Sequence, residues 1–190
     1  MIRAFVGIRV PDDITRLLTG IQAGLDFGRI VPPQNFHITL AFLGEHPEPM
    51  VEDVHSLLDG IRPDPIDLRI EGLGVFGGER PRSLFAEIVP SKPLGTLRKK
   101  VRTAAREAGI DLGHEHYHPH ITLARFAGNG LVGPEVLDLQ AFLSARMGRT
   151  RGAFTAEGFT LFESRLGSEA PHYAPLAEYG VPEELKHSLT

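Results

Sequence analysis

The sequence contains no cysteine, so disulfide bonds and thiolate metal sites are excluded. It also lacks any apolar run near the ~20 residues that a helix needs to cross a bilayer. The apolar stretch at the N-terminus is too short for a signal peptide, and Asp12 and Asp13 follow it closely. An excess of positive charge is missing as well, because the formal net charge is −4. Proteins that coat long nucleic acids are usually basic. We therefore expect a cytoplasmic protein whose contact with nucleic acid, if any, is local.

What the sequence does contain is an internal duplication. The pentapeptide His-Ile-Thr-Leu-Ala begins at His37 and recurs letter for letter at His120, 83 residues later. A repeat at a fixed offset is the signature of duplicated structural units. The 190 residues suit one compact domain or two small lobes that share a core.

Other segments repeat at similar offsets. The stretch 3–8 resembles 83–88 and equates Phe5 with Phe85, at an offset of 80. A Glu-Gly pair with a Phe four residues after the Gly occurs at 71–76 and again at 157–162, at an offset of 86. The small drift between offsets corresponds to insertions of loop size. Each half is thus predicted to run strand, helix, His-x-Thr strand, helix, Glu-Gly strand.

Apolar residues at helical spacing predict four helices, over 12–25, 49–60, 94–108 and 134–147, the first of them capped by Asp12 or Asp13. A further strand is expected at 172–179, followed by a tail over 181–190. We predict an α+β fold in which 1–180 form one domain with two pseudo-symmetric lobes. The repeated halves cover about 1–80 and 81–165, each lobe is an antiparallel sheet with helices, and an active-site cleft lies between them.

Strand geometry gives the repeated pentapeptide a chemical meaning. Side chains alternate faces along a strand, so His37 and Thr39 share one face, and His120 and Thr122 do the same. Two-fold symmetry can bring both polar faces to one cleft. An imidazole with an ordinary pKa near ~6.5 can accept or donate a proton at neutral pH. Two imidazoles and two hydroxyls suit in-line displacement at phosphorus without a metal, with the hydroxyls holding phosphate oxygens.

Two other interpretations compete with catalysis. Histidines kept by an old duplication could serve packing alone, but a packing role would not preserve His and Thr together. The run 114–120 places His114, His116, His118 and His120 at alternate positions, and imidazoles suit zinc, nickel or copper. This run has no counterpart before His37 and no carboxylate or cysteine partners of the usual zinc arrangement. We therefore expect no catalytic metal and no cofactor, while adventitious metal binding by this run stays open from the sequence.

The sequence does contain one basic run, of five residues. It lies on the helix expected at 94–108. The run could form a patch that faces phosphate, but we favour the interpretation that it is a solvated helix face. Its members are Arg98, Lys99, Lys100, Arg102 and Arg106.

Two His-x-Thr motifs about eighty residues apart in a duplicated chain of this length resemble the two-histidine phosphoesterase superfamily. The segments 35–44 and 118–125 are most similar to the bacterial and archaeal RNA 2′,3′-cyclic phosphodiesterases, once called 2′-5′ RNA ligases. The resemblance covers almost the whole chain. It implies hydrolysis of a terminal 2′,3′-cyclic phosphate on RNA or a nucleotide to a 2′-phosphate. Separately, we expect a monomer without a protein or membrane partner.

The resemblance also implies residue roles. His37 would donate a proton to the leaving 3′ oxygen, His120 would accept one from water, and Thr39 and Thr122 would bind the phosphate. Arg125 and Phe42 match positions that contact the nucleotide, near the phosphate and the base. Both lie five residues after their histidine, so strict alternation would turn them away from the cleft. A bulge or the end of the strand must rotate them back.

Three aromatic residues, Phe5, Phe126 and Tyr173, could stack on a base, although core packing is the better interpretation for each. Two alternative functions remain open from the sequence. One is ligation of RNA halves through a 2′-5′ bond, which is the same chemistry with a 5′-hydroxyl in place of water. The other is non-catalytic binding of RNA or a nucleotide.

Overall fold

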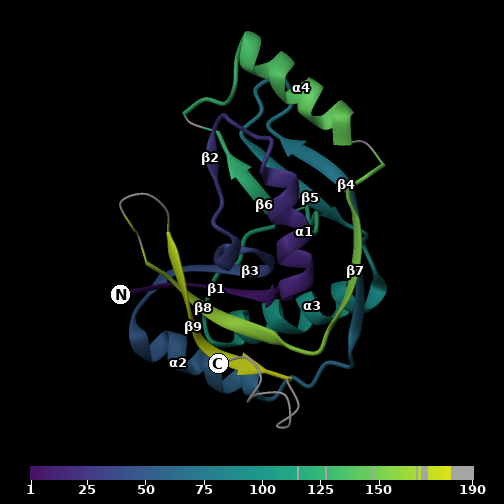
Figure 1. Cartoon of the computed structure of the whole chain (residues 1–190). Helices are drawn as coiled ribbons and strands as arrows, with labels where there is room; N and C mark the ends of the chain where they lie inside the picture. The colour runs from purple at the N-terminus through teal and green to yellow at the C-terminus, as the bar shows by residue number, and fades with distance from the viewer. Residues whose placement is uncertain (115, 127, 147, 166, 168–170, 181–190) are drawn as a thin grey trace.

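The computed structural model of the chain describes residues 1–190 except 115, 127, 147, 166, 168–170 and 181–190 (Figure 1). The predicted tail therefore lies outside the described residues. The strands are β1 (Ile2–Arg9), β2 (Arg29–Ile30), β3 (His37–His46), β4 (Ile66–Phe76), β5 (Ser83–Ile88), β6 (His120–Arg125), β7 (Arg151–Ala156), β8 (Phe159–Arg165) and β9 (His172–Tyr179). The helices are α1 (Asp12–Gln22), α2 (Glu48–Asp59), α3 (Lys92–Glu107) and α4 (Pro134–Arg146), with a short 3₁₀ turn, η1 (Pro33–Asn35).

The architecture is α+β and two-lobed, as predicted. Within the described residues the strands follow the order β7-β4-β5-β6-β3-β1-β8-β9, and β2 pairs beside β6. All these pairings are antiparallel. The first four strands form one lobe and the last four form the other. The two lobes meet where β3 pairs with β6, at the single residue pair Ile38 and Ile121.

The lobes do not coincide with the halves of the sequence, because the third strand of each half is exchanged. Strand β4 of the first half pairs with β5 of the second half, and β8 of the second half pairs with β1 of the first half. Each lobe is therefore built from both halves. This exchange, which the repeat offsets do not reveal, ties the two lobes together more firmly than the one residue pair at their junction.

The pairing register corrects one sequence alignment. Arg9 lies opposite His37 on β3, and Glu87 lies opposite His120 on β6, so these strands are equivalent at an offset of 78. The structural counterpart of Phe5 is thus Ser83, and the predicted equivalence with Phe85 is wrong by two residues. A shift of two keeps the same face of the strand, which explains why the apolar pattern alone did not expose it.

The four helices lie close to their predicted ranges. Their buried residues fall on one face, as Ile14, Leu18 and Ile21 do on α1. The cap predicted for α1 is wrong: Pro11 occupies the N-cap without a side-chain hydrogen bond, and Asp12 and Asp13 lie in the first turn. There their charges favour the positive end of the helix dipole. Helix α1 packs against β6 and β7, and α3 packs against β3 and α2, so each of these helices crosses to the other lobe.

The basic run on α3 is partly structural. The Arg102 side chain is buried and donates hydrogen bonds to the carbonyl oxygens of Leu112 and Gly113, at 3.4 and 2.6 Å. Arg106 also donates to the Leu112 carbonyl, at 3.2 Å. The prediction that the run forms a solvated face is therefore wrong for Arg102, which is buried, whereas Arg106 is exposed as predicted. Both residues hold the loop that leads to β6 through these hydrogen bonds.

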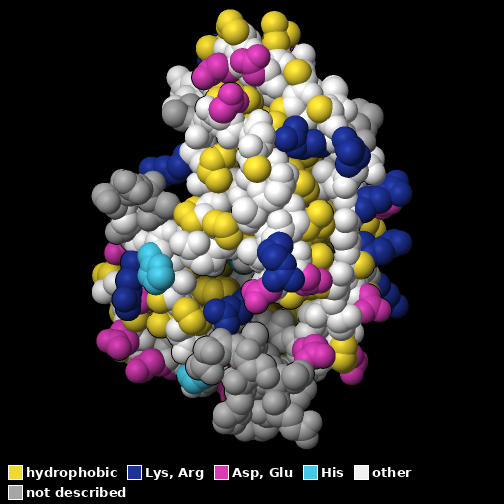
Figure 2. Space-filling view, in the orientation of Figure 1, with side chains coloured by type: hydrophobic (Ala, Val, Ile, Leu, Met, Phe, Trp, Pro, Cys, Tyr) yellow, Lys and Arg dark blue, Asp and Glu magenta, His cyan; other side chains and the backbone are white. Residues whose placement is uncertain are grey.

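The visible surface carries basic and acidic side chains interspersed, with apolar side chains exposed over α4 at the top of the view (Figure 2). Leu137 on α4 is 65% exposed. Among the described helices, none combines the length and the hydropathy that a bilayer-spanning helix requires.

Candidate active site

The junction of the lobes brings the two pentapeptides together. Because β3 and β6 are antiparallel and Ile38 is paired with Ile121, His37 lies beside Thr122, and Thr39 lies beside His120. Ile38 and Ile121 are completely buried, whereas the two histidines and two threonines on the opposite face are partly exposed. The charge of His120 also acts on His37. The four side chains therefore lie around one junction, and we call this group the shared face.

Both imidazole rings are held in the same way. Nδ1 of His37 lies 2.7 Å from the carbonyl oxygen of Asn35, and Nδ1 of His120 lies 2.7 Å from the carbonyl oxygen of His118. A carbonyl oxygen can only accept, so each Nδ1 carries the hydrogen. Each Nε2 is thereby left with a lone pair for proton transfer. The backbone carbonyls of Asn35 and His118 fix this tautomer, and the sequence alone gave no sign of their role.

Each histidine also packs against a pair of phenylalanines. Phe5 and Phe162 flank His37, with ring centroids 4.6 and 6.3 Å from its ring. Phe85 and Phe76 flank His120, at 5.2 and 4.9 Å.

In each pair one ring comes from each half of the sequence, as a consequence of the strand exchange. The phenylalanines that marked the duplication in the sequence therefore form the walls of the site. Tyr173 adds an edge-on contact to His37, at 5.2 Å between centroids, so this predicted stacking residue packs on the histidine.

This packing controls protonation. Burial lowers the pKa of His37 to about 4; the hydrogen bond to Asn35 opposes that shift, and the charges of Arg125 and His120 add to it. Burial also lowers the pKa of His120, with the hydrogen bond to His118 opposing and the charges of His118 and Arg125 adding. Both rings are thus neutral at pH 7 in the free protein. A negatively charged ligand on the shared face would favour protonation of one of them.

Bulges turn Phe42 and Arg125 toward the shared face. In β3 the pairing with β1 shifts between Thr39 and Ala41, and in β6 the pairing with β5 shifts between Thr122 and Ala124. Each bulge reverses the alternation of faces beyond it. Phe42 is 61% exposed and its ring centroid lies 6.1 Å from that of Phe5. The charge of Arg125 acts on both histidines. Phe42 and Arg125 each lie five residues after their histidine and needed a bulge to face the same side. That bulge is present in both strands.

Tyr117, which the sequence analysis did not single out, holds the backbone of Thr39, the phosphate-binding candidate on β3. The Tyr117 hydroxyl donates to the carbonyl oxygen of Thr39 at 3.2 Å, and the guanidinium of Arg98 lies over the Tyr117 ring at 4.1 Å. Tyr117 precedes β6, so this hydrogen bond crosses the junction of the lobes next to the pair formed by Ile38 and Ile121. Phe126, the third stacking candidate, is buried against Phe27, with ring centroids 5.9 Å apart.

The histidine run does not assemble into a metal site in the part of the chain that is described. No group of three or more His, Asp or Glu side chains there is arranged to hold an ion. The rings of His118 and His120 are 6.4 Å apart between centroids, and Nε2 of His118 lies 3.7 Å from a Glu87 carboxylate oxygen. The intervening residue 115 lies outside the described residues.

Comparison with known proteins identifies a family. The model of a family described as LigT like Phosphoesterase matches residues 8–85 and 88–173, that is, both repeated halves. An RNA 2′,3′-cyclic phosphodiesterase of Bacillus subtilis is 30% identical over 181 residues, which cover 92% of this chain and 94% of that protein. One from Aquifex aeolicus is 35% identical over 133 residues, covering 66% and 71%.

A solved structure agrees with the sequence relatives. The crystal structure of Escherichia coli LigT complexed with 3′-AMP superposes with a TM-score of 0.76 at 25% identity, covering 96% of this chain and 99% of that one. The similarity extends over both lobes and their junction.

Proposed function

The chain belongs to the family of LigT-like phosphoesterases, and on this basis we propose that it is an RNA 2′,3′-cyclic phosphodiesterase, a hydrolase that opens terminal cyclic phosphates. The observation that carries the proposal is the pair of histidines on the shared face. Each has its Nδ1 hydrogen fixed by a backbone carbonyl and its Nε2 available for proton transfer. Two threonines lie beside them, suited to a phosphate oxygen each.

The proposed reaction is an in-line displacement at phosphorus. Nε2 of His120 removes a proton from water, and the water oxygen forms a bond to phosphorus. The bond from phosphorus to the ribose 3′ oxygen breaks, and Nε2 of protonated His37 gives its proton to that oxygen. The hydroxyls of Thr39 and Thr122 hold the two non-bridging oxygens throughout. The product is a 2′-phosphate with a free 3′-hydroxyl, and general acid-base catalysis of this kind contributes about 10²–10⁴-fold per group.

Protonation of His37 depends on the substrate. In the free protein its pKa is about 4, mainly because of burial. The negative charge of the bound cyclic phosphate raises that pKa, because an opposite charge within ~4–6 Å favours the charged form. Arg125, whose positive charge acts on both histidines, balances the charge that builds up on the phosphate oxygens. The exposed ring of Phe42 is available to the base of the nucleotide.

We further propose RNA ends or nucleotides that carry a 2′,3′-cyclic phosphate as the substrates, with the chain acting as a monomer. The cytoplasmic location expected from the sequence stays a prediction.

The test is turnover of 2′,3′-cyclic nucleotides in excess EDTA, with the product identified by ³¹P NMR. We expect full activity with the chelator and a 2′-phosphate as the only product. Loss of activity on chelation would contradict the metal-free mechanism. A 3′-phosphate product would mean that the 2′ oxygen leaves, and would contradict the assignment of His37 as the proton donor to the 3′ oxygen.

A further inference from the structure

The backbone pairing that joins the two lobes at the shared face is short. In the described part of the chain, β3 and β6 pair only at Ile38 and Ile121. The Ile38 carbonyl lies toward β1, because a Cβ atom on Gly7 would be 2.9 Å from its oxygen. Successive carbonyls of a strand point to opposite edges, so that of Thr39 points toward β6. It lies beyond the last residue pair of the two strands and needs a donor from elsewhere.

Tyr117 supplies that donor. Its hydroxyl donates to the Thr39 carbonyl oxygen at 3.2 Å, and the Arg98 guanidinium lies 4.1 Å from the centre of its ring. Arg98 belongs to α3, which packs against β3, whereas Tyr117 belongs to the segment that leads into β6. A cation over the face of an aromatic ring is attracted to it. The Tyr117 side chain therefore comes from the β6 side of the junction and contacts two groups on the β3 side.

The same short segment also holds the His120 ring. The residue after Tyr117 is His118, whose carbonyl oxygen lies 2.7 Å from Nδ1 of His120. The segment 117–120 thus connects the Thr39 backbone to the His120 imidazole, and Thr39 and His120 lie side by side on the shared face. In the proposed reaction one of them holds a phosphate oxygen and the other accepts a proton. A shift of Tyr117 would therefore change the position of these two groups relative to each other.

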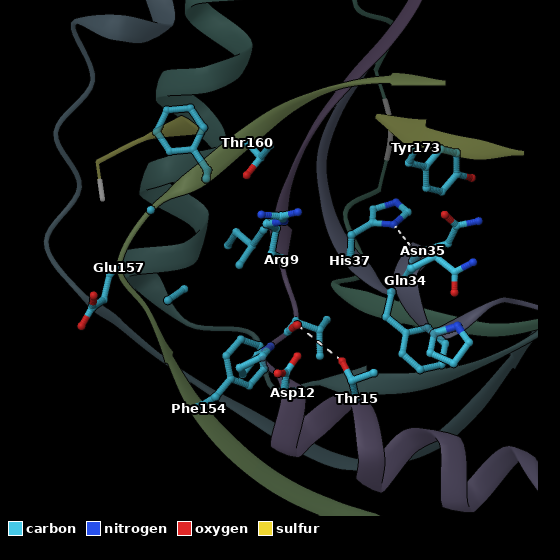
Figure 3. Close-up of a pocket in the computed structure, with 18 of the residues that line it drawn as sticks. Arg9, Asp12, Thr15, Gln34, Asn35, His37, Phe154, Glu157, Thr160 and Tyr173 are labelled. Atoms are coloured by element: carbon cyan, nitrogen blue, oxygen red, sulfur yellow. Dashed lines mark hydrogen bonds between the residues drawn. The ribbon is translucent and has the colours of Figure 1, made fainter. Parts of the chain in front are cut away.

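The other half of the shared face has no equivalent contact. At the repeat offset of 83, Gln34 corresponds to Tyr117. Gln34 is exposed and, in the described part of the chain, makes no hydrogen bond to the carbonyl of Thr122. It lies with Asn35 and the His37 ring along a cavity of about 1110 Å³, and Tyr117 does not line that cavity (Figure 3). The hydroxyl contact across the junction therefore acts on the Thr39 half alone.

We propose that Tyr117 is a positioning residue, whose hydroxyl fixes the Thr39 backbone relative to His120. The inference rests on the proposed function, in which Thr39 and Thr122 each hold one non-bridging oxygen of the phosphate. Tyr117 does not touch the substrate in this role and acts through the Thr39 backbone. Loss of its hydroxyl therefore weakens the grip on the oxygen at Thr39 and leaves the oxygen at Thr122 unaffected.

The test uses the two diastereomers of uridine 2′,3′-cyclic phosphorothioate. Each diastereomer replaces one non-bridging oxygen with sulfur, which is a weaker hydrogen-bond acceptor. The kcat/KM of the oxygen ester divided by that of each diastereomer gives a sulfur penalty for each oxygen position. Thr39→Val removes the hydroxyl that binds one position, so it should reduce the penalty of one diastereomer. That result identifies the diastereomer whose sulfur faces Thr39.

Tyr117→Phe removes the hydroxyl and keeps the ring beside Arg98. We expect it to lower kcat/KM of the oxygen ester about 2- to 10-fold, the equivalent of one net hydrogen bond. It should also reduce the sulfur penalty of the diastereomer identified by Thr39→Val, and of that diastereomer alone. Added to Thr39→Val, it should change neither penalty further, because the two residues act through one contact.

The matched control is Tyr179→Phe. It removes a tyrosine hydroxyl that lies 2.8 Å from Nδ1 of His55, on the pair β9 and α2 rather than at the junction of the lobes. Both sulfur penalties should stay as in the parent chain. The carbonyl ¹³C shift of Thr39, measured by NMR in the free protein, should change in Tyr117→Phe and not in Tyr179→Phe.

Three outcomes would overturn the proposal. One is a Tyr117→Phe variant with the penalties and kcat/KM of the parent chain. Another is an equal change in the penalties of both diastereomers, which would make Tyr117 a general structural residue. The third is an unchanged Thr39 carbonyl shift, which would show that the hydrogen bond is absent in solution.

The positioning role and the proposed function fail separately. If the parent chain hydrolyses no cyclic phosphate, the proposed function is wrong, whatever the Thr39 carbonyl shift shows about the hydrogen bond. If the parent chain hydrolyses the oxygen ester and Thr39→Val reduces one penalty while Tyr117→Phe changes nothing, the function stands and the positioning role is wrong.

Discussion

Gly7 lets β1 pass so close to β3 that a Cβ atom at residue 7 would lie 2.9 Å from the carbonyl oxygen of Ile38. The same atom would lie 3.4 Å from Cδ2 of His37. The Ile38 carbonyl oxygen belongs to the backbone, so it cannot move aside as the end of a flexible side chain can. The space above Gly7 is taken by the Phe5 ring, whose Cε2 would be 3.6 Å away. Residue 7 thus sets the position of a proposed catalytic ring from the neighbouring strand.

We therefore predict that Gly7→Ala lowers both stability and activity. Crowding of this kind in a packed region costs about 1–3 kcal/mol of unfolding free energy, and displacement of His37 should reduce kcat by more than it changes KM. The control is Gly20→Ala on the exposed side of α1, where a new Cβ meets nothing within 4 Å. That change should stabilise the protein by about 0.5–1 kcal/mol. Urea unfolding measures the change in unfolding free energy, and steady-state kinetics measures the change in kcat and KM. A fully active Gly7→Ala variant would contradict the prediction.

Substitution of either histidine tests the acid-base pair. His37→Ala and His120→Ala should each reduce kcat about 10²–10⁴-fold, because each removes one proton-transfer group. His114→Ala, which changes an exposed histidine of the same run, is the matched control and should remain active in EDTA. Circular dichroism would verify that all three variants are folded. Normal turnover after either of the first two changes would refute the assignment.

The buried state of His37 predicts a pH dependence of stability. Its pKa is about 4 in the folded chain, mainly because of burial, against ~6.5 when unfolded. Between these two pH values the unfolded chain binds more protons than the folded chain. The contribution of neutral His37 to the unfolding free energy is therefore fully present above pH ~6.5 and is lost as the pH falls toward 4. His120, whose pKa is also lowered, acts in the same direction.

Chemical denaturation at a series of pH values measures this loss, and it should be smaller in His37→Ala. Titration of the ring by NMR should place the His37 pKa near 4 in the free protein and higher with bound 2′-AMP. The Nδ1-protonated tautomer should dominate at pH 7 because of the 2.7 Å contact with the Asn35 carbonyl. An unperturbed pKa would show that the ring is not enclosed by Phe5 and Tyr173 in solution.

Arg125 should matter for substrate binding. Its position after the β6 bulge places its charge near both histidines, so Arg125→Ala should raise KM about 10-fold or more, the value of one charge-assisted hydrogen bond. Removing its charge should also raise the pKa of both histidines. Lys99→Ala, on the exposed side of α3, removes the same charge elsewhere and should leave KM unchanged. If Arg125→Ala and Lys99→Ala changed KM equally, the effect would come from the net charge of the protein and not from the position of Arg125.

Much of this could be predicted from the sequence because of the duplication. The apolar spacing of α1 and α3 gave their ranges to within a few residues, since helical amphipathicity is a local property. Strand parity correctly placed His37 and Thr39 on one face, because the alternation holds as far as the bulge. The same reasoning showed that Phe42 needed a bulge without locating it.

Other features could not be predicted because they depend on long-range pairing. Strand β7 was missed, since it is a short edge strand whose alternation of Gly152 and Phe154 with exposed residues is weak. The true alignment of β1 with its repeat counterpart β5 was hidden because a shift of two residues preserves the buried face. The cavity beside His37 has no sequence signature, because its walls come from β1, η1, β8 and β9, which are far apart in the chain.

The sequence by itself determined that two identical His-x-Thr strands exist, that each turns its histidine and threonine to one side, and that the chain resembles a family of phosphodiesterases. Those conclusions follow from local geometry and from repetition. Only the tertiary structure decided that the halves exchange their third strands, so that each histidine lies between one phenylalanine from each half. It also decided that the environments of the two histidines differ, since packing between distant segments sets burial, and burial sets the pKa of each ring.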